Sequence, residues 1–150
     1  MNKVDFKRAS FRDHATILEM MREYFSFDCI PWNRHIPSAL KSLLTRRNFG
    51  EVILIRVGAE NAGYLVLTYG FDLEFGGRQA WVTDLYIRAE FRRLGLGKKA
   101  MRFLSLWSRR NGVKAIELQV THKNKKALLF YKAMGFKAYD RILMSKWMGA

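Results

Sequence analysis

The spacing of apolar residues along the chain predicts short strands that alternate with amphipathic helices. Strand-like apolar runs or alternation occupy five segments: 4–9, 51–57, 62–71, 80–87 and 114–120. Helical spacing governs four others: 10–25, 37–48, 97–110 and 124–134. A last stretch, 136–147, is predicted to form a final strand. This order predicts a mixed-sheet α/β domain.

Cap and turn residues set the expected boundaries of these elements. Ser10 and Asp13 have the spacing of a capping box at the start of the first helix. Pro37 suits the first turn of the second helix. Gly112 and Gly135 follow the third and fourth helices, where a glycine is expected to end them.

Composition limits the class of protein. With 150 residues, of which 49% are hydrophobic, the chain is expected to form one globular domain over 1–150. No apolar run reaches the roughly 18 residues of a membrane span, and the opening residues show no secretory signal. Cys29 is the only cysteine, and no Cys/His cluster has zinc spacing. We therefore expect a cytoplasmic protein without a metal.

The net charge of +14 is unevenly distributed. Residues 88–126 contain only two acidic residues, Glu90 and Glu117, against twelve basic ones: Arg88, Arg92, Arg93, Lys98, Lys99, Arg102, Arg109, Arg110, Lys114, Lys123, Lys125 and Lys126. Such a region can be a solvated basic surface, a nucleic-acid-binding surface or a local anion site.

Two lysine pairs favour the anion site. Lys98 and Lys99 follow Gly97 in the first turn of one predicted helix, and Lys125 and Lys126 follow Asn124 at the start of another. Cations are unfavourable at helix N-termini, because the helix dipole is positive there. A bound polyanion would offset that cost.

The segment 85–97, LYIRAEFRRLGLG, has the form of a phosphate-binding loop. A predicted strand ends near Ile87, and two glycines then open a helix, whose N-terminal N–H groups attract anions. The run GLGKKA formally fits a dinucleotide-binding pattern, but seven residues separate it from the strand. No G-K-[ST] sequence follows, so a Walker loop is excluded.

The loop Arg92-Arg93-Leu94-Gly95-Leu96-Gly97 resembles the [QR]-x-x-G-x-[GA] loop of the GNAT superfamily of acyl-CoA N-acyltransferases. The segment NKKALLFYKAMGF, residues 124–136, resembles the family's later motif. This resemblance implies a mixed, mostly antiparallel sheet, flanked by helices, in which strands four and five splay apart to admit the pantetheine arm. It also implies acetyl-CoA as the acyl donor.

The resemblance also implies roles for individual residues. The backbone of strand four would pair with the pantetheine amides, the loop N–H groups would hold the pyrophosphate, and Asn124 would bind the pantetheine arm. The implied cofactor-binding residues are Leu85, Ile87, Arg92, Arg93, Leu94, Gly95, Leu96, Gly97, Lys98 and Asn124. Tyr131 would protonate the leaving thiolate as a general acid. On a helix, Asn124 and Tyr131 share a face, about 10 Å apart along the axis.

A general base is less clearly marked in the sequence. Trp81 and Thr83 occupy positions where some family members carry a glutamate. Asp84, in strand four, is the first candidate for the residue that takes a proton from the amine. Glu74, at the preceding hairpin, and Glu117, on strand five, are the alternatives.

The acceptor site is expected in the front half of the chain. Phe25, Phe27, Asp28 and Trp32 could form an aromatic wall for a cationic amine, or they could anchor an irregular loop on the sheet. His14, His35 and His122 suggest no ligand set.

The sequence therefore predicts an acetyl-CoA-dependent N-acetyltransferase that acts on a primary amine of a small molecule, by direct attack in a ternary complex. One alternative is a protein or peptide N-acetyltransferase that modifies a lysine or an N-terminal amine. The other is a basic nucleic-acid-binding module, which the position of the basic residues disfavours. The sequence allows a homodimer.

Overall fold

A computed structural model describes residues 3–149 of the protein. The chain divides into two compact units, with the boundary between Gln119 and Val120. The first unit contains the sheet and three α-helices, and the second contains one helix and the C-terminal segment. A single domain over 1–150 remains a prediction from the sequence.

The sheet of the first unit has five strands in the order β1-β2-β3-β4-β5. Their bounds are Val4–Arg8 (β1), Gly50–Val57 (β2), Glu60–Asp72 (β3), Gly77–Ile87 (β4) and Ala115–Leu118 (β5). Neighbours among β1 to β4 are antiparallel, and β4 and β5 are parallel. The mixed, mostly antiparallel sheet predicted from the sequence is thus confirmed.

The helices begin close to the predicted cap residues. The bounds are Phe11–Asp13 (η1), His14–Phe27 (α1), Ile36–Thr45 (α2), Ala89–Phe91 (η2), Leu96–Arg110 (α3) and Lys125–Ala133 (α4). The capping box is present, since the Ser10 N–H donates to the Asp13 carboxylate at 2.9 Å. Pro37 lies in the first turn of α2, as expected.

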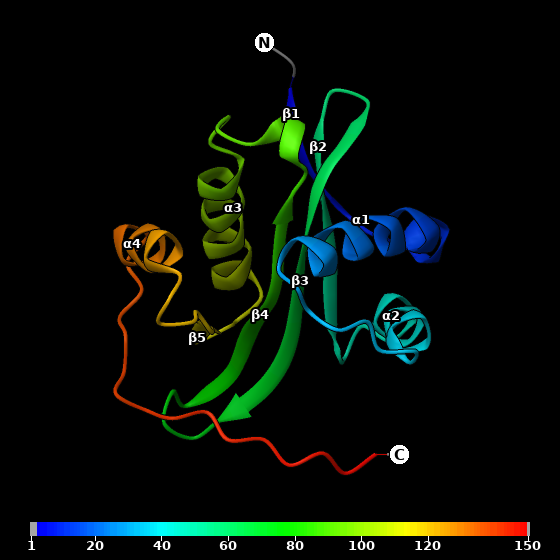
Figure 1. The fold of residues 1–150 in the computed structure, drawn as a ribbon. Helices are drawn as coiled ribbons and strands as arrows, with labels where there is room; N and C mark the ends of the chain where they lie inside the picture. The colour runs from blue at the N-terminus through cyan, green and yellow to red at the C-terminus, as the bar shows by residue number, and fades with distance from the viewer. Residues whose placement is uncertain (1–2, 150) are drawn as a thin grey trace. The chain divides into compact units, whose positions relative to one another are not determined.

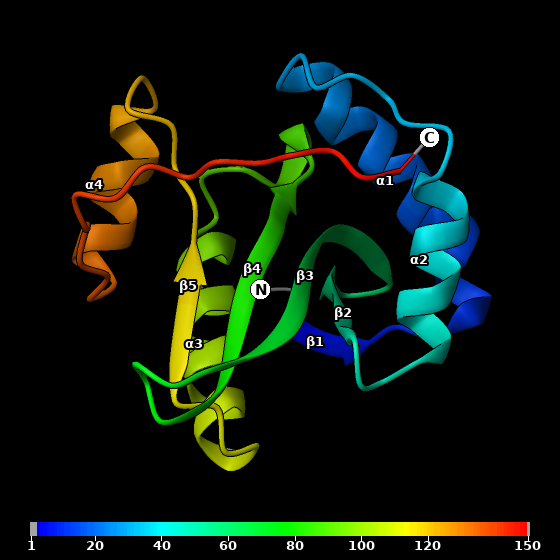
Figure 2. The ribbon, with the colours of Figure 1, turned by 90° about the horizontal axis from the view of Figure 1, so that it is seen from below.

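Apolar side chains cover both faces of the sheet in the first unit. On one face, Ile17 and Met20 of α1 and Leu40 of α2 pack on Tyr64 and other buried strand residues. On the opposite face, α3 packs on β2 and β3 and on the end of β4. Figures 1 and 2 show α1 and α2 together on one side of the sheet and α3 on the other.

A β-bulge in β4 opens the sheet. Val66 of β3 pairs with Asp84, while its neighbour Leu67 pairs with Val82, so Thr83 has no counterpart on β3. A bulge bends the strand and increases its twist. The pairing of β4 with β5 ends at Val82 and Leu118, although β4 continues for five residues to Ile87. The predicted splay of strands four and five therefore begins at the bulge.

The C-terminal segment of the second unit differs from the prediction. Residues 136–149 contain no strand, so the expected final strand over 136–147 is wrong. The distribution of charged residues explains the error, because both faces of such a strand would carry charged side chains among the apolar ones. Asp140 and Lys146 interrupt one alternate set, and Lys137 and Arg141 interrupt the other.

Candidate active site

The loop before α3 presents a row of backbone donors. Arg93 and Gly95 both have left-handed backbone conformations, with φ values of 64° and 71°. Within residues 3–149, the N–H groups of residues 93–98 have no hydrogen-bond acceptor. Left-handed residues in a turn direct successive N–H groups into one concavity, which binds anions. The side chain of Leu96, buried beneath the loop, anchors the start of α3.

The surroundings of this loop suit a phosphate. The first turn of α3 contains Lys98 and Lys99 and no acidic residue, and both lysines are exposed. A Cβ atom added at Gly95 would meet nothing within 4 Å, so the space in front of the loop is open. The free N–H groups, the helix dipole and the two ammonium groups together fit the pyrophosphate of a coenzyme A derivative.

The end of β4 leaves backbone groups free on its splayed side. The Arg88 N–H donates to the Ala62 carbonyl at 2.9 Å, so Arg88 and Tyr86 direct their peptide groups toward β3. Because peptide groups alternate along a strand, Leu85 and Ile87 direct their N–H and carbonyl groups to the opposite edge of β4. The pairing with β5 on that edge has already ended at Val82. The Ile87 carbonyl already accepts a 3.0 Å hydrogen bond from the Arg92 guanidinium. The Ile87 N–H and both peptide groups of Leu85 can therefore pair with an extended ligand.

Asp84 lies beside the bulge, on the sheet face that α1 and α2 cover. Its Oδ2 accepts a 3.2 Å hydrogen bond from the hydroxyl of Tyr64, which is fully buried. Burial raises the pKa of Asp84 to about 6, and the hydrogen bond from Tyr64 opposes that rise. A carboxyl group with a pKa near the working pH is suited to accept a proton.

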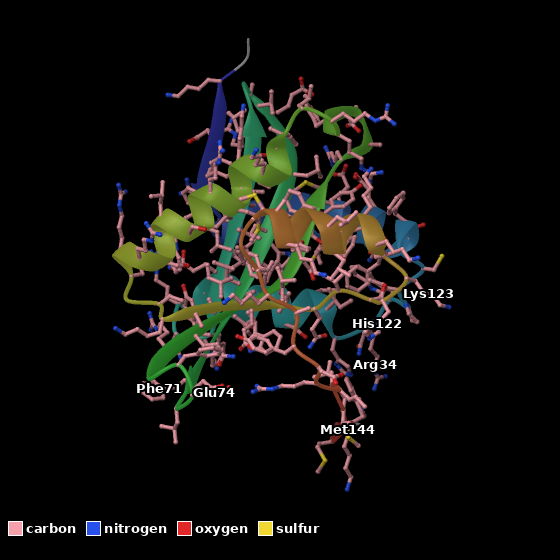
Figure 3. All side chains as sticks on the ribbon, turned by 90° about the vertical axis from the view of Figure 1, so that its left-hand side faces the viewer. Arg34, Phe71, Glu74, His122, Lys123 and Met144 are labelled. Atoms are coloured by element: carbon pink, nitrogen blue, oxygen red, sulfur yellow. The ribbon has the colours of Figure 1, made fainter. Side chains whose placement is uncertain are left out.

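The structure separates the other two carboxylates from Asp84. Glu74 lies in the turn between β3 and β4, and Figure 3 shows it with Phe71 at the tip of the hairpin. Asp84 is about 20 Å farther along β4, given the rise per residue of a strand. Glu117 pairs with Trp81 on β5, and its side chain accepts a hydrogen bond from Gln79. Of the three candidate bases, Asp84 is the one that lies in the splayed section of β4.

Two ion pairs fix the end of β4 against α1. The Arg88 guanidinium contacts Glu19 at 2.7 Å and Glu23 at 3.0 Å, and the Tyr86 hydroxyl donates to Glu23 at 3.0 Å. These contacts join residues more than 60 positions apart, so the sequence pattern did not indicate them. They hold the strand that carries Asp84, Leu85 and the start of the loop.

The model of the acetyltransferase (GNAT) family matches residues 15–136. The chain belongs to the GNAT acetyltransferase family. Thialysine N-epsilon-acetyltransferase of Mus musculus is 26% identical over 160 aligned residues, which cover 99% of this chain and 91% of that protein.

Two solved structures illustrate the shared fold. An integron cassette protein from the mobile metagenome of Cole Harbour Salt Marsh is 27% identical, with a TM-score of 0.84, over 97% of this chain and 91% of that one. An aminoglycoside acetyltransferase from an uncultured soil metagenomic sample has a TM-score of 0.79 at 18% identity, over 98% and 97%. The second similarity concerns the fold alone.

The remaining two predicted site residues of this acetyltransferase, Asn124 and Tyr131, lie in the second unit. Asn124 caps α4, since its side chain accepts a 3.1 Å hydrogen bond from the Ala127 N–H. Tyr131 packs edge-on against Phe130 and Phe136, with ring centroids 5.0 and 5.7 Å away. Burial raises the pKa of Tyr131, so its hydroxyl stays protonated at neutral pH. Seven positions of one helix separate the two residues, which therefore share a face.

The aromatic residues in the last turn of α1 and just after it contact the chain's own arginines. The Arg22 guanidinium lies 4.3 Å from the centroid of Trp32, and that of Arg92 lies 4.3 Å from Phe27. Phe25 packs against Trp32, with centroids 5.6 Å apart. Because arginines of the chain already occupy these ring faces, the contacts favour the interpretation that the aromatic residues anchor this segment. They do not favour an aromatic wall for a cationic amine.

Sequence reasoning missed Tyr64 and did not give Thr83 a role. The only signal for Tyr64 was its position in a buried strand, because a buried tyrosine hydroxyl requires a polar partner.

Among residues 3–149, no group of three His, Cys, Asp or Glu side chains could hold a metal ion. No helix in that range is both long enough and apolar enough to cross a bilayer.

Proposed function

We propose that this acetyltransferase uses acetyl-CoA to acetylate a primary amine of a small molecule, by direct attack in a ternary complex. The observation that carries the proposal is the row of six free N–H groups before and within the first turn of α3, from Arg93 to Lys98. Acetyl-CoA supplies an activated acetyl group as a thioester. The family implies this donor, and the loop fits its pyrophosphate.

The first unit would bind the donor and prepare the amine. The loop N–H groups hold the pyrophosphate, and the Ile87 N–H and both peptide groups of Leu85 pair with the pantetheine arm as an added strand would. Above about pH 6 the Asp84 carboxylate is ionised, so it accepts the proton that the amine loses, directly or through a water molecule.

The second unit would bind the arm and complete the proton transfers. Asn124 hydrogen-bonds to the pantetheine while it caps α4, and the Tyr131 hydroxyl donates its proton to the departing sulfur. The carbon–nitrogen bond forms and the carbon–sulfur bond breaks. One proton reaches Asp84 and one leaves Tyr131, and solvent exchange restores both groups.

The test is an acetyl-transfer assay with a panel of acceptors: alkylamines, polyamines, aminoglycosides, amino acids and peptides with free N-termini. Product should be identified by mass spectrometry, because Cys29 is an exposed free thiol that reacts with thiol reagents. Acetylation of small amines supports the proposal. Acetylation of peptides alone would show a protein or peptide acetyltransferase instead, and no product with any acceptor would refute transfer to an amine.

A further inference from the structure

An apolar pocket adjoins the bulge of β4 in the first unit. Its cavity volume is about 390 Å³, and it lies between α1 and α2 on one side and β3 and β4 on the other. Thr83, the bulged residue, forms part of its wall, and the next residue is Asp84. Thr83 and Ala39 are both exposed, so the pocket is open to solvent.

The lining of this pocket is uncharged. Leu40, Leu43, Phe49 and Val66 provide apolar walls, and its polar side chains are the hydroxyls of Ser42 and two threonines. None of the lining residues in the described part of the chain is ionisable. A second ammonium group placed in this pocket would lose its hydration without gaining a carboxylate partner. An alkyl or aryl group would instead gain apolar contacts there.

The charge of the whole chain acts in the same direction. At +14, the protein repels acceptors that carry several positive charges more strongly than those that carry one. A polyamine or an aminoglycoside would therefore be disfavoured both on approach to the protein and inside the pocket.

We propose that the pocket beside Thr83 binds the body of the acceptor, and that the acceptor is a monoamine with an apolar alkyl or aryl group. The amine lies at Thr83 and Asp84, and the apolar group extends between Leu40 and Val66. This inference rests on the proposed acetyltransferase function and specifies its substrate class. Hydroxyls of Ser42 and Thr68 leave room for one neutral polar substituent on that group.

A matched pair of acceptors tests the inference. Hexylamine and 1,6-diaminohexane have the same length and differ in one terminal ammonium group. With acetyl-CoA at saturation, we expect kcat/KM to be at least tenfold higher for hexylamine. Across ethylamine, propylamine, butylamine and hexylamine, each added methylene should raise kcat/KM about fourfold until the pocket is full.

A charge substitution in the pocket provides the second test. Ser42→Asp introduces a carboxylate into the wall formed by α2, and Ser38→Asp introduces the same charge on the same helix, at an exposed position that does not line the pocket. We expect Ser42→Asp to raise the ratio of diamine to monoamine kcat/KM at least tenfold and Ser38→Asp to leave it unchanged. Thermal melting and acetyl-CoA calorimetry verify that both variants are folded.

The outcomes separate this inference from the proposed function. Faster acetylation of diamines or polyamines than of alkylamines by the unaltered protein would overturn the inference and leave amine acetylation intact. An equal change of the ratio in both variants would also overturn it. If no amine is acetylated, the proposed function fails. Calorimetry of hexylamine binding then decides, without any activity, whether the pocket binds an apolar monoamine. Binding by the unaltered protein and loss of binding in Ser42→Asp would support it, and absence of binding would overturn it.

Discussion

The hydroxyl of Tyr64 donates a 3.2 Å hydrogen bond to Oδ2 of Asp84, across the antiparallel pair β3 and β4. Tyr64 is fully buried, and the regular register beyond the bulge, in which Tyr64 pairs with Tyr86 and Val66 with Asp84, places Asp84 on the same face of the sheet. Burial raises the pKa of Asp84 from 3.8 to about 6, while the hydrogen bond from Tyr64 lowers it. The pair therefore holds a carboxyl group that changes charge near neutral pH.

The first prediction concerns the pH dependence of acetyl transfer. If Asp84 accepts the proton of the amine, kcat/KM calculated for the neutral form of the amine should rise about tenfold per pH unit below pH 6 and level off above it, because only the ionised carboxylate acts as a base. Initial rates from pH 4.5 to 8 measure this profile. Asp84→Asn should remove the limb near pH 6 and lower kcat by at least 100-fold. A limb that persists in Asp84→Asn would assign the titration to another group.

The second prediction concerns stability. The pKa of Asp84 is higher in the folded chain than in the unfolded chain, so the native state binds more protons between about pH 4 and pH 6. Its contribution to the free energy of unfolding therefore falls as the pH rises through this window, by about 3 kcal/mol at most. Asp84→Asn, which cannot ionise, should melt at a higher temperature than the unaltered protein at pH 8 and at a similar temperature at pH 4. An equal difference at both pH values would contradict this.

The third prediction separates Tyr64 from a general packing role. Tyr64→Phe removes the hydrogen bond that lowers the Asp84 pKa, so the acid limb of kcat/KM should move above pH 6. Tyr86→Phe is the matched control, since Tyr86 lies on the same face and its hydroxyl donates to Glu23. The limb should stay near pH 6 in the control. Equal shifts in the two variants would show that loss of packing, rather than the hydrogen bond, moves the pKa.

Local patterns predicted those parts of the site that depend on local geometry. The glycines and lysines of 92–99 indicated an anion loop because backbone conformation and helix charge are set within a few residues. Asn124 was placed at the start of a predicted helix for the same reason, and in the structure it caps α4. The order of strands and helices over 4–133 followed from apolar spacing, and the observed elements agree with it.

Features that depend on pairing between distant segments were not predictable from those patterns. Thr83 becomes a bulge because of the register between β3 and β4, which no local signal records. The same register brings Tyr64 to Asp84, 20 positions away. The proposed strand over 136–147 was wrong because a run of apolar residues does not form a strand without a uniform apolar face and a partner. Glu74 precedes Asp84 by only ten positions in the sequence, but the extended strand β4 carries Asp84 far from the turn that contains Glu74.

The fourth prediction tests the loop without loss of folding. Gly97→Asp places a carboxylate in the first turn of α3, where the helix dipole favours negative charge, so the melting temperature should not fall. The same carboxylate would repel the pyrophosphate, and the Kd for acetyl-CoA should rise at least 100-fold in calorimetry. Gly97→Asn, of equal size and without charge, is the control and should have a much smaller effect. Unchanged affinity in Gly97→Asp would remove the loop from the donor site.

The fifth prediction concerns Tyr131. Its hydroxyl has no hydrogen-bond partner within residues 3–149, and burial keeps it protonated by raising its pKa. If it protonates the departing sulfur, Tyr131→Phe should lower kcat by about 10²- to 10⁴-fold and leave the Kd for acetyl-CoA unchanged, because the ring and its contacts with Phe130 and Phe136 are retained. Tyr139→Phe, at an exposed position of the same unit, is the control and should retain full turnover. A less basic leaving group needs less protonation, so an acetyl thioester of a more acidic thiol should recover part of the lost rate in Tyr131→Phe. Full turnover in Tyr131→Phe, or no recovery with the better leaving group, would exclude the hydroxyl as the general acid.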